Sequence, residues 1–312
     1  MTRNLKRALI TDFDNTLFDW VDVWFRSFSA MLKEISRISE IDERFLKSQI
    51  RAIHQRHGTS EYSFVIEEIP ALQTKYGQHG LAEIFSSAIE AYRAQRRTYL
   101  TLYPTVADTL LRMKGSGAII VCYTESMAFY SNYRVRRLGL DGVFDYVFSP
   151  EDHDIPMGLS PEEIRSYPMF HYKFRYTVHE HTARGSKKPD PDVLRTICKR
   201  IGVDPEECVY VGDSLWRDVA MAQRAGISDV WAKYGQANDR AEYDLLRELT
   251  HWSSDDVERE RKLRATDVVP SVILEHSFSE LLDHFELGGS RTGIRSARRA
   301  MRNSRASAAA QT

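Results

Sequence analysis

The most constraining stretch of this sequence is a short apolar run that ends in two alternating carboxylates, ALITDFDNTLF at residues 8–18. The run predicts a buried strand that continues into a loop. Because side chains alternate between the two faces of an extended chain, Asp12 and Asp14 point the same way while Phe13 turns into the core. When two carboxylates lie so near each other, they resist being ionised together unless a cation or hydrogen-bond donors lie between them. The alternative is a strand edge followed by a turn or helix cap, where Asp, Asn and Thr are also common.

Three later stretches favour a functional interpretation of this pair. They are AIIVCYT at 118–124, GSKKP at 185–189 and CVYVGDSLWRD at 208–218. The first and third are apolar strands that end in a hydroxyl and in Gly-Asp-Ser, and the second sets a lysine before a proline. Ligands of an open parallel sheet bind beyond the carboxyl ends of its strands. The side chains of Asp12, Thr124 and Asp213 are therefore predicted to converge.

The order Asp-x-Asp-x-Thr, Thr, Lys-Pro, Gly-Asp-Ser-x-x-x-Asp resembles the haloacid dehalogenase-like (HAD-like) hydrolase superfamily. The resemblance covers most of residues 8–20 and 101–285. It implies an α/β fold: a Rossmann-like, doubly wound, mainly parallel sheet with an α-helical cap domain inserted after the first motif.

The hydrophobic pattern agrees with that organisation. Apolar residues at helical spacing predict a helical cap over 18–100, and strands alternating with helices predict a core of 1–17 and 101–285, with an inserted segment at 152–186. Residues 286–312 carry six arginines and predict a disordered basic tail. The predicted core helices are 105–114, 126–138, 190–202, 216–225 and 277–285, and the predicted strands are 7–12, 118–123, 145–148, 208–212 and 229–232, with a further one at 271–275.

The resemblance also implies roles for single residues. Asp12 would attack phosphorus and form an aspartyl-phosphate. Asp14 would protonate the leaving alcohol and then deprotonate the attacking water. Thr124 would hydrogen-bond a phosphoryl oxygen, and a lysine would offset the crowded negative charge. Lys188 is preferred over Lys187 because it directly precedes the proline.

A metal site is expected among the same residues. Asp12, Asp213 and Asp218 would hold Mg²⁺, a hard cation that binds through a few carboxylates and leaves room for a phosphate oxygen. The resemblance implies that Asp14 contacts the metal through its backbone carbonyl. The alternative for Asp213 and Asp218 is that they cap a helix N-terminus. Dehalogenases of this superfamily lack a general acid at the second Asp, so Asp14 favours phosphate substrates.

Two features depart from the family pattern. Glu125 follows Thr124 where an Asn or a small residue is common, and the inserted segment separates the second motif from the lysine. Alternating aromatic and basic residues at 170–178 predict a half-buried strand. From it, Lys173 or Arg175 would hold a second anionic group of the substrate. The alternatives are a charged edge strand and, for His179 with His181, a zinc site.

Composition sets further limits. A net charge of −1 over 312 residues implies no polyanionic partner for the whole chain. Three scattered cysteines indicate no disulfide framework, and no run approaches the ~18 apolar residues needed to span a membrane. We therefore expect a cytoplasmic protein with no membrane partner, and contact with RNA, lipid or an acidic partner only as an alternative role of the tail.

Together these features predict a Mg²⁺-dependent phosphomonoester hydrolase that acts on a small phosphorylated metabolite. A phosphomutase with the same site, and a non-catalytic protein that binds a phosphorylated ligand or a partner, are the alternatives. The identity of the substrate, the oligomeric state and the roles of the inserted segment and tail stay open.

Overall fold

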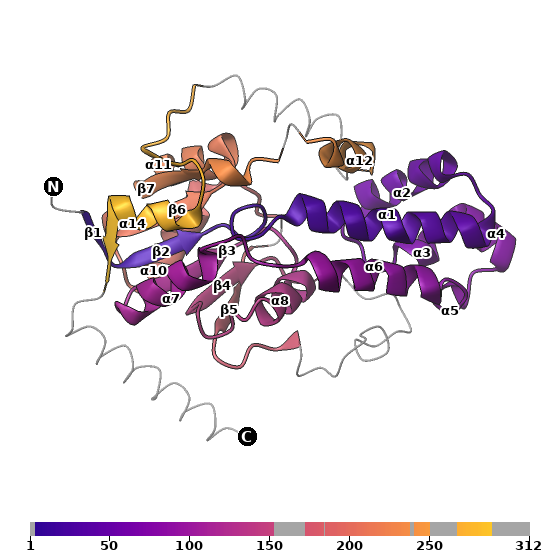
Figure 1. Ribbon diagram of the computed structural model, residues 1–312, viewed down its shortest axis with the longest axis horizontal. Coiled ribbons are helices and arrows are strands. Elements are labelled where there is room, and N and C mark those ends of the chain that lie inside the picture. Colours follow the sequence, from indigo (N-terminus) through magenta and orange to yellow (C-terminus); the bar gives the residue numbers. More distant parts are fainter. Residues whose placement is uncertain (1–3, 153–171, 184, 238–239, 250–266, 289–312) are drawn as a thin grey trace. The chain divides into compact units, whose positions relative to one another are not determined.

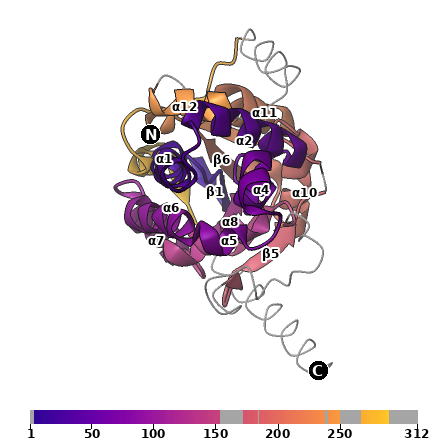
Figure 2. The same cartoon turned by 90° about the vertical axis from the view of Figure 1, so that its right-hand side faces the viewer.

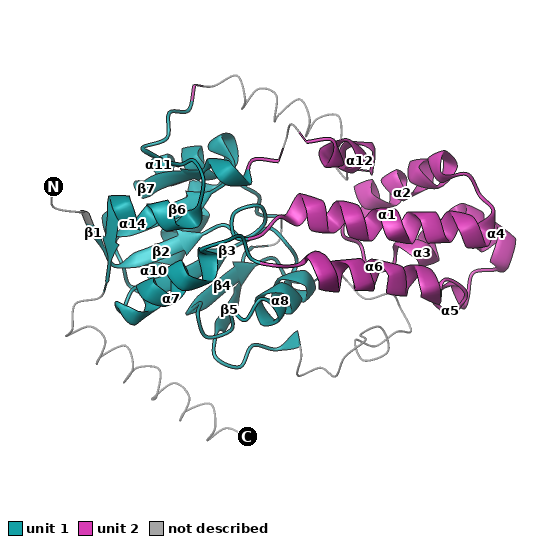
Figure 3. Ribbon diagram, viewed as in Figure 1, with its two compact units in different colours: residues 1–17, 102–235, 268–312 teal, residues 18–101, 236–267 magenta. Residues whose placement is uncertain are grey.

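The computed structural model describes residues 4–152, 172–183, 185–237, 240–249 and 267–288. The chain divides into two compact units, an α/β unit of residues 1–17, 102–235 and 268–312 and a helical unit of residues 18–101 and 236–267 (Figure 3). The predicted core range 101–285 thus includes a segment, 236–267, that the structure groups with the helices. The predicted tail lies outside the described residues from position 289 onward.

A seven-stranded sheet forms the centre of the α/β unit, in the order β5-β4-β3-β2-β6-β7-β8. Every neighbouring pair is parallel; β3, β4 and β5 extend the sheet on one side of β2, and β6, β7 and β8 extend it on the other. This confirms the predicted doubly wound, mainly parallel α/β fold. The strands are β2 (Ala8–Thr11), β3 (Ile119–Tyr123), β4 (Tyr146–Ser149), β5 (Val178–His181), β6 (Cys208–Gly212), β7 (Ser228–Ala232) and β8 (Val272–Leu274).

Helices cover both faces of this sheet. In Figure 2, α10 and α11 lie on one side of β6 and α7 lies on the other. Leu194, Ile197 and Met221 of the first side pack against Ile10 and Tyr210 of the sheet in one buried cluster. The helices of the unit are α7 (Val106–Gly115), α8 (Ala128–Arg137), α10 (Pro191–Ile201), α11 (Ala220–Ala225) and α14 (Leu281–His284), with the 3₁₀ turns η2 (Pro205–Glu207), η4 (Lys233–Gly235) and η5 (Phe278–Glu280) and the π-helix η3 (Leu215–Val219).

The two ends of the described chain pair with each other. Strand β1 (Asn4–Lys6) runs parallel to β9 (Phe285–Leu287) in a separate two-stranded sheet. The helix predicted at 277–285 is therefore shorter than expected, because Phe285 already belongs to β9. Ordered structure also continues beyond residue 285, where the tail was predicted to begin.

The strand predicted at 170–178 is wrong over its described part. Of its described residues only Val178 lies in a strand, the first position of β5, and residues 172–177 are irregular. Residues 170 and 171 lie outside the described chain.

A single carboxylate explains the irregular backbone. Asp141 accepts hydrogen bonds from the backbone N–H groups of Arg175, Tyr176 and Thr177, at 2.8, 3.0 and 3.0 Å. Three successive N–H groups that converge on one side chain cannot alternate as they do in a strand. These contacts outweigh burial and hold the pKa of Asp141 below its usual value.

The helical unit is built on two long helices that run side by side, α1 (Trp20–Ser39) and α6 (Ser86–Tyr99) (Figures 1 and 2). A buried stripe on α1 at helical spacing explains its packing: Trp24, Phe28, Met31, Leu32 and Ile35. The other helices are α2 (Glu43–His57), α3 (Val65–Glu68), α4 (Pro70–Tyr76), α5 (Leu81–Ile84) and α12 (Glu242–Leu249). Within the described residues, no helix has the length and apolar character that a membrane crossing requires.

Helix α12 is anchored to this unit although it follows β7 in the chain. Its Leu249 carbonyl accepts a hydrogen bond of 2.7 Å from Nδ1 of the buried His54. Glu248 forms an ion pair of 2.9 Å with Lys47, and Arg240, just before the helix, pairs with Asp19. These contacts bring residues far apart in sequence into one unit.

The buried His54 makes the stability of the helical unit depend on pH. Burial lowers its pKa from 6.5 to about 4, so the folded state stays neutral where the unfolded chain already binds a proton. The contribution of His54 is thus fully present above pH 6.5 and is lost as the pH falls toward 4. We expect the unfolding free energy to fall by about 2 kcal/mol between about pH 7 and about pH 5 from this residue.

Urea unfolding followed by tryptophan fluorescence, to which Trp20 and Trp24 of α1 contribute, measures this loss. The variant His54→Leu, which cannot titrate, serves as the control and should show a correspondingly flatter pH dependence. An unchanged pH dependence in His54→Leu would assign the effect to other groups.

Candidate active site

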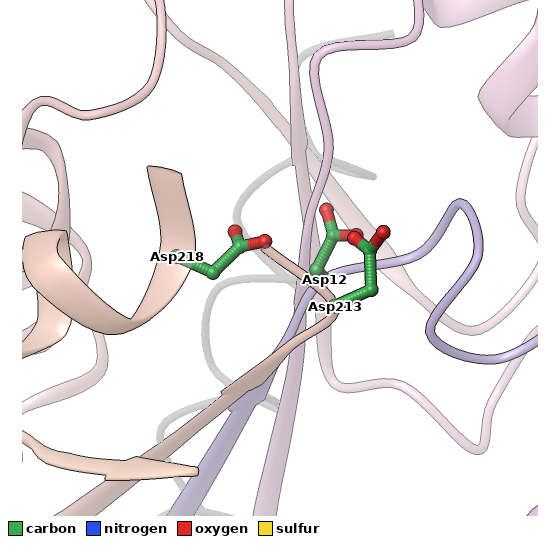
Figure 4. A group of neighbouring side chains, drawn as sticks. All are labelled: Asp12, Asp213 and Asp218. Atoms are coloured by element: carbon green, nitrogen blue, oxygen red, sulfur yellow. The ribbon is translucent and has the colours of Figure 1, made fainter. Parts of the chain in front are cut away.

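Three acidic side chains meet at the carboxyl edge of the sheet. Asp12 follows β2 and Asp213 follows β6, and Asp218 extends from η3 toward both (Figure 4). One carboxylate oxygen of each lies within 4.8 Å of the others, and among the described residues this is the group suited to holding a cation. The backbone N–H of Asp12 donates to the carbonyl of Val211 at 2.8 Å, which fixes the two strand ends against each other.

Lys188 provides the positive charge inside this group. Its Nζ donates to Asp12 and, at 2.8 Å, to Asp218, and it lies over the rings of Tyr123 and Tyr210, 5.0 and 5.6 Å from their centroids. Burial acts to lower the pKa of Lys188, but the two carboxylates outweigh it and raise that pKa well above its usual value. Lys188 is thus a buried ammonium, whereas Lys187 is exposed.

The surrounding charge and burial perturb the acids as well. Burial raises the pKa of Asp12 to about 7; Asp218 and Asp14 add to the rise, while Lys188 opposes it. Burial, with the nearby Asp218 and Asp12, also raises the pKa of Asp213 well above its usual value. One ammonium does not balance three carboxylates, so the donor set suits a hard divalent cation.

Asp218 mainly holds the lysine. Its Oδ1 accepts from Lys188 and, at 2.8 Å, from the hydroxyl of Tyr210, and its Oδ2 accepts from the backbone N–H of Ser214 at 3.1 Å. Gly212 is required here, because a Cβ at that position would lie 2.3 Å from Cγ of Asp218.

The carboxylate of Asp14 has different partners and lies outside the acidic group. Thr124 and Ser126 donate to its Oδ2 at 3.2 and 2.7 Å, and Arg134 donates to its Oδ1 at 3.2 Å. The hydroxyl of Thr124 also accepts from the backbone N–H of Ser126 at 3.0 Å. Asp12 and Asp14 thus occupy distinct electrostatic environments although they are two residues apart.

Glu125, the departure from the family pattern, is neutralised locally. Its Oε1 accepts the backbone N–H of Lys188 at 3.0 Å, and its Oε2 forms an ion pair with Arg217. The Glu125 carboxylate therefore links its own loop to the segments that carry Lys188 and Arg217.

The structure does not bring Lys173 and Arg175 to the site. Both are exposed and precede β5, at the amino edge of a parallel sheet whose acidic residues follow the carboxyl ends. Strand β5 then carries the chain across the sheet to the loop with Lys188. The substrate-binding role expected for Lys173 and Arg175 gains no support from this placement.

The histidines of β5 have other partners. Nε2 of His179 lies 2.8 Å from Oγ of Ser149, and its ring lies 4.6 Å from that of His181, centroid to centroid. Among the described residues, no third ligand joins them in a metal-binding group.

Sequence reasoning missed Ser126, Tyr210 and Arg134. Tyr210 alternates with Val209 and Val211 along β6, as any core residue would. Arg134 gave the stronger signal, since it shares the helical stripe of Tyr130, Ser131 and Val135, all buried on α8.

Sequence comparison decides the family. A sequence model described as haloacid dehalogenase-like hydrolase matches residues 6–226. The chain belongs to this family. The HAD-like hydrolases that it resembles include the glyceraldehyde 3-phosphate phosphatase of Methanopyrus kandleri, 24% identical over 75% of this chain and 86% of the relative. Another is phosphoglycolate phosphatase 1 of Pseudomonas aeruginosa, 27% identical over 76% of this chain and 72% of the relative.

Solved structures are more distantly similar. The 2-haloacid dehalogenase of Pseudomonas syringae pv. Tomato aligns with a TM-score of 0.48 and 20% identity, covering 90% of this chain and 97% of that one. The HAD phosphatase of Thermococcus onnurineus aligns with a TM-score of 0.48 and 19% identity, covering 89% and 99%.

Proposed function

We propose that this HAD-like hydrolase is a phosphatase that hydrolyses small phosphomonoesters through an aspartyl-phosphate on Asp12. The main support for the proposal is that two neighbouring carboxylates have different partners. Asp12 contacts the buried ammonium of Lys188, whereas Asp14 contacts Thr124, Ser126 and Arg134. This contrast supports attack on phosphorus by Asp12 and proton transfer by Asp14.

In the first half-reaction, an oxygen of Asp12 bonds to phosphorus while the bond from phosphorus to the leaving oxygen breaks. Lys188 compensates the negative charge that gathers on Asp12 and the phosphoryl group. Asp14 gives its proton to the leaving oxygen, which departs as an alcohol. In the second half-reaction, Asp14 takes a proton from water as that water attacks phosphorus and releases Asp12.

In this scheme Thr124 contacts both Asp14 and the phosphoryl group. Its single hydroxyl proton is donated to Asp14 in the structure, so a hydrogen bond from Thr124 to a phosphoryl oxygen requires that proton to turn toward the substrate.

A divalent cation, Mg²⁺ by preference, fits the acidic group. Asp12 and Asp213 would hold it, with Asp218 contributing through the acceptor capacity that the backbone N–H of Ser214 leaves on its Oδ2. Bound there, the cation supplies charge against the substrate phosphate. The carbonyl of Asp14 is proposed as a further ligand on the family resemblance.

The relatives guide the choice of substrates. Those compared above are named for glyceraldehyde 3-phosphate and phosphoglycolate, both small phosphorylated metabolites. We propose a substrate of that class, and we propose that residues 18–100 act as the cap that selects it. A panel of such metabolites, assayed for release of inorganic phosphate, tests the proposal. Release from none of them would contradict it, and turnover that needs a bisphosphate activator and releases no phosphate would indicate a mutase.

Removal of the metal provides a second test. We expect EDTA to slow phosphate release at least about tenfold and Mg²⁺ to restore it, because three carboxylates and one lysine leave the site too negative for a phosphate. Ca²⁺ should inhibit, since its larger and looser coordination shell disturbs the alignment of the reacting groups. Full activity in EDTA, after extensive dialysis, would overturn the metal assignment.

A further inference from the structure

Arg134 is a buried charge that the proposed reaction has not yet used. It lies on α8 with its side chain 3% exposed, in the middle of a helix face that packs against the unit's interior. Removing a guanidinium from water is costly, and such residues are rarely buried unless they are paired. The position of Arg134 therefore needs a specific explanation.

Its partners supply that explanation. One nitrogen, Nη1, donates both to Oδ1 of Asp14 at 3.2 Å and to Oγ of Ser126 at 2.7 Å. Because Ser126 accepts from Arg134, its own proton is directed to Oδ2 of Asp14, 2.7 Å away. The guanidinium thus acts on both oxygens of the carboxylate, directly on one and through a hydroxyl on the other.

Two further contacts orient this group. The guanidinium of Arg134 lies 5.5 Å from the ring centroid of Tyr130, one turn earlier on α8. Ser126 is held in turn by Ser131, whose hydroxyl donates to the Ser126 carbonyl at 2.7 Å. Contacts made by α8, the helix that follows the second motif, therefore orient Arg134 and Ser126, the two residues that donate to Asp14.

We propose that Arg134, with Ser126, is a positioning residue for Asp14 that sets its acid and base function. This inference rests on the proposed phosphatase activity. When Asp14 transfers its proton to the leaving oxygen, the carboxylate that forms is stabilised by Arg134 and Ser126, and it stays oriented for the proton of the attacking water. Arg134 itself touches neither the phosphoryl group nor Asp12 in this scheme.

The dependence on the leaving group distinguishes this role from a structural one. An alkyl alcohol must be protonated as it leaves, whereas para-nitrophenolate leaves without a proton. We expect Arg134→Met to lower kcat/KM about 100-fold for an alkyl phosphate and less than about threefold for para-nitrophenyl phosphate, since general acid catalysis contributes roughly 10²–10⁴-fold. Arg134→Lys should recover part of the alkyl activity, because it restores the charge without the guanidinium geometry.

A double-mutant cycle gives the deciding measurement. In an Asp14→Asn background, Arg134→Met should cause no further loss with the alkyl phosphate, because the group through which it acts is absent. Arg137→Met, an exposed arginine on the same helix, is the matched control and should leave both substrates unaffected. If Arg134→Met does not fold, the same cycle is measured with Arg134→Lys.

Two results would overturn the inference: equal losses for both substrates, or additive losses in the cycle. Both leave the phosphatase proposal intact, because wild-type turnover is measured in the same assay. A wild-type protein that releases no phosphate from either substrate would instead contradict the proposed function itself.

Discussion

We expect Asp12→Asn to reduce phosphate release at least about 10⁴-fold, because the substitution removes the attacking charge while keeping nearly the same volume. The backbone N–H bond from residue 12 to Val211 and the contact with Thr16, which donates to Oδ2 at 3.2 Å, can both persist in the variant. The protein should therefore stay folded, with a circular dichroism spectrum like that of the wild type.

A control substitution shows whether the loss is specific to the active site. Asp108→Asn makes the same chemical change at an exposed position of α7 and should leave turnover unchanged. Asp12→Asn that keeps more than a few per cent of wild-type turnover, with contaminating phosphatases excluded, would disprove attack by Asp12.

The second large effect is expected at Lys188. Lys188→Met keeps the length of the side chain but leaves Asp12 and Asp218 without the ammonium that both now accept from. Removing one partner of a buried ion pair costs about 3–5 kcal/mol of stability, which we expect as a lowered melting temperature. Turnover should fall at least about 10³-fold, because the charge that offsets the phosphoryl group is lost.

The neighbouring residue offers a control one position away. Lys187 is exposed, and Lys187→Met should change neither melting temperature nor turnover by a measurable amount. Comparable losses in both variants would mean that the charge of the whole loop matters, and not the buried contact of Lys188 with Asp12.

The site residues that could be predicted from the sequence are those that directly follow a strand. Asp12, Thr124 and Asp213 each follow an apolar strand, and ligands bind beyond the carboxyl ends of parallel strands. In the structure Asp12 and Asp213 lie in one acidic group, and Thr124 contacts Asp14. Lys188 was predicted from its place before Pro189, which only the family resemblance made informative.

Other features depend on contacts between distant residues, which local patterns do not reveal. The alternation at 170–178 is typical of a strand, yet Asp141, more than thirty residues earlier, turns that backbone away from strand geometry. The same holds for α12, which reaches the helical unit through His54, and for Arg134, whose partner Asp14 lies 120 residues away. In each case the structure depends on polar contacts between residues far apart in the sequence.

Attack by Asp12 leaves a phosphoryl group on that residue, and this adduct can be sought directly. Enzyme in excess is mixed with the best substrate of the metabolite panel, quenched in acid at early times, and its peptides are analysed by mass spectrometry. We expect the peptide containing Asp12 to gain one phosphoryl group transiently, and the Asp12→Asn variant to show no such adduct. Full substrate turnover in the wild type with no adduct at any time, or an adduct on another residue, would contradict attack by Asp12.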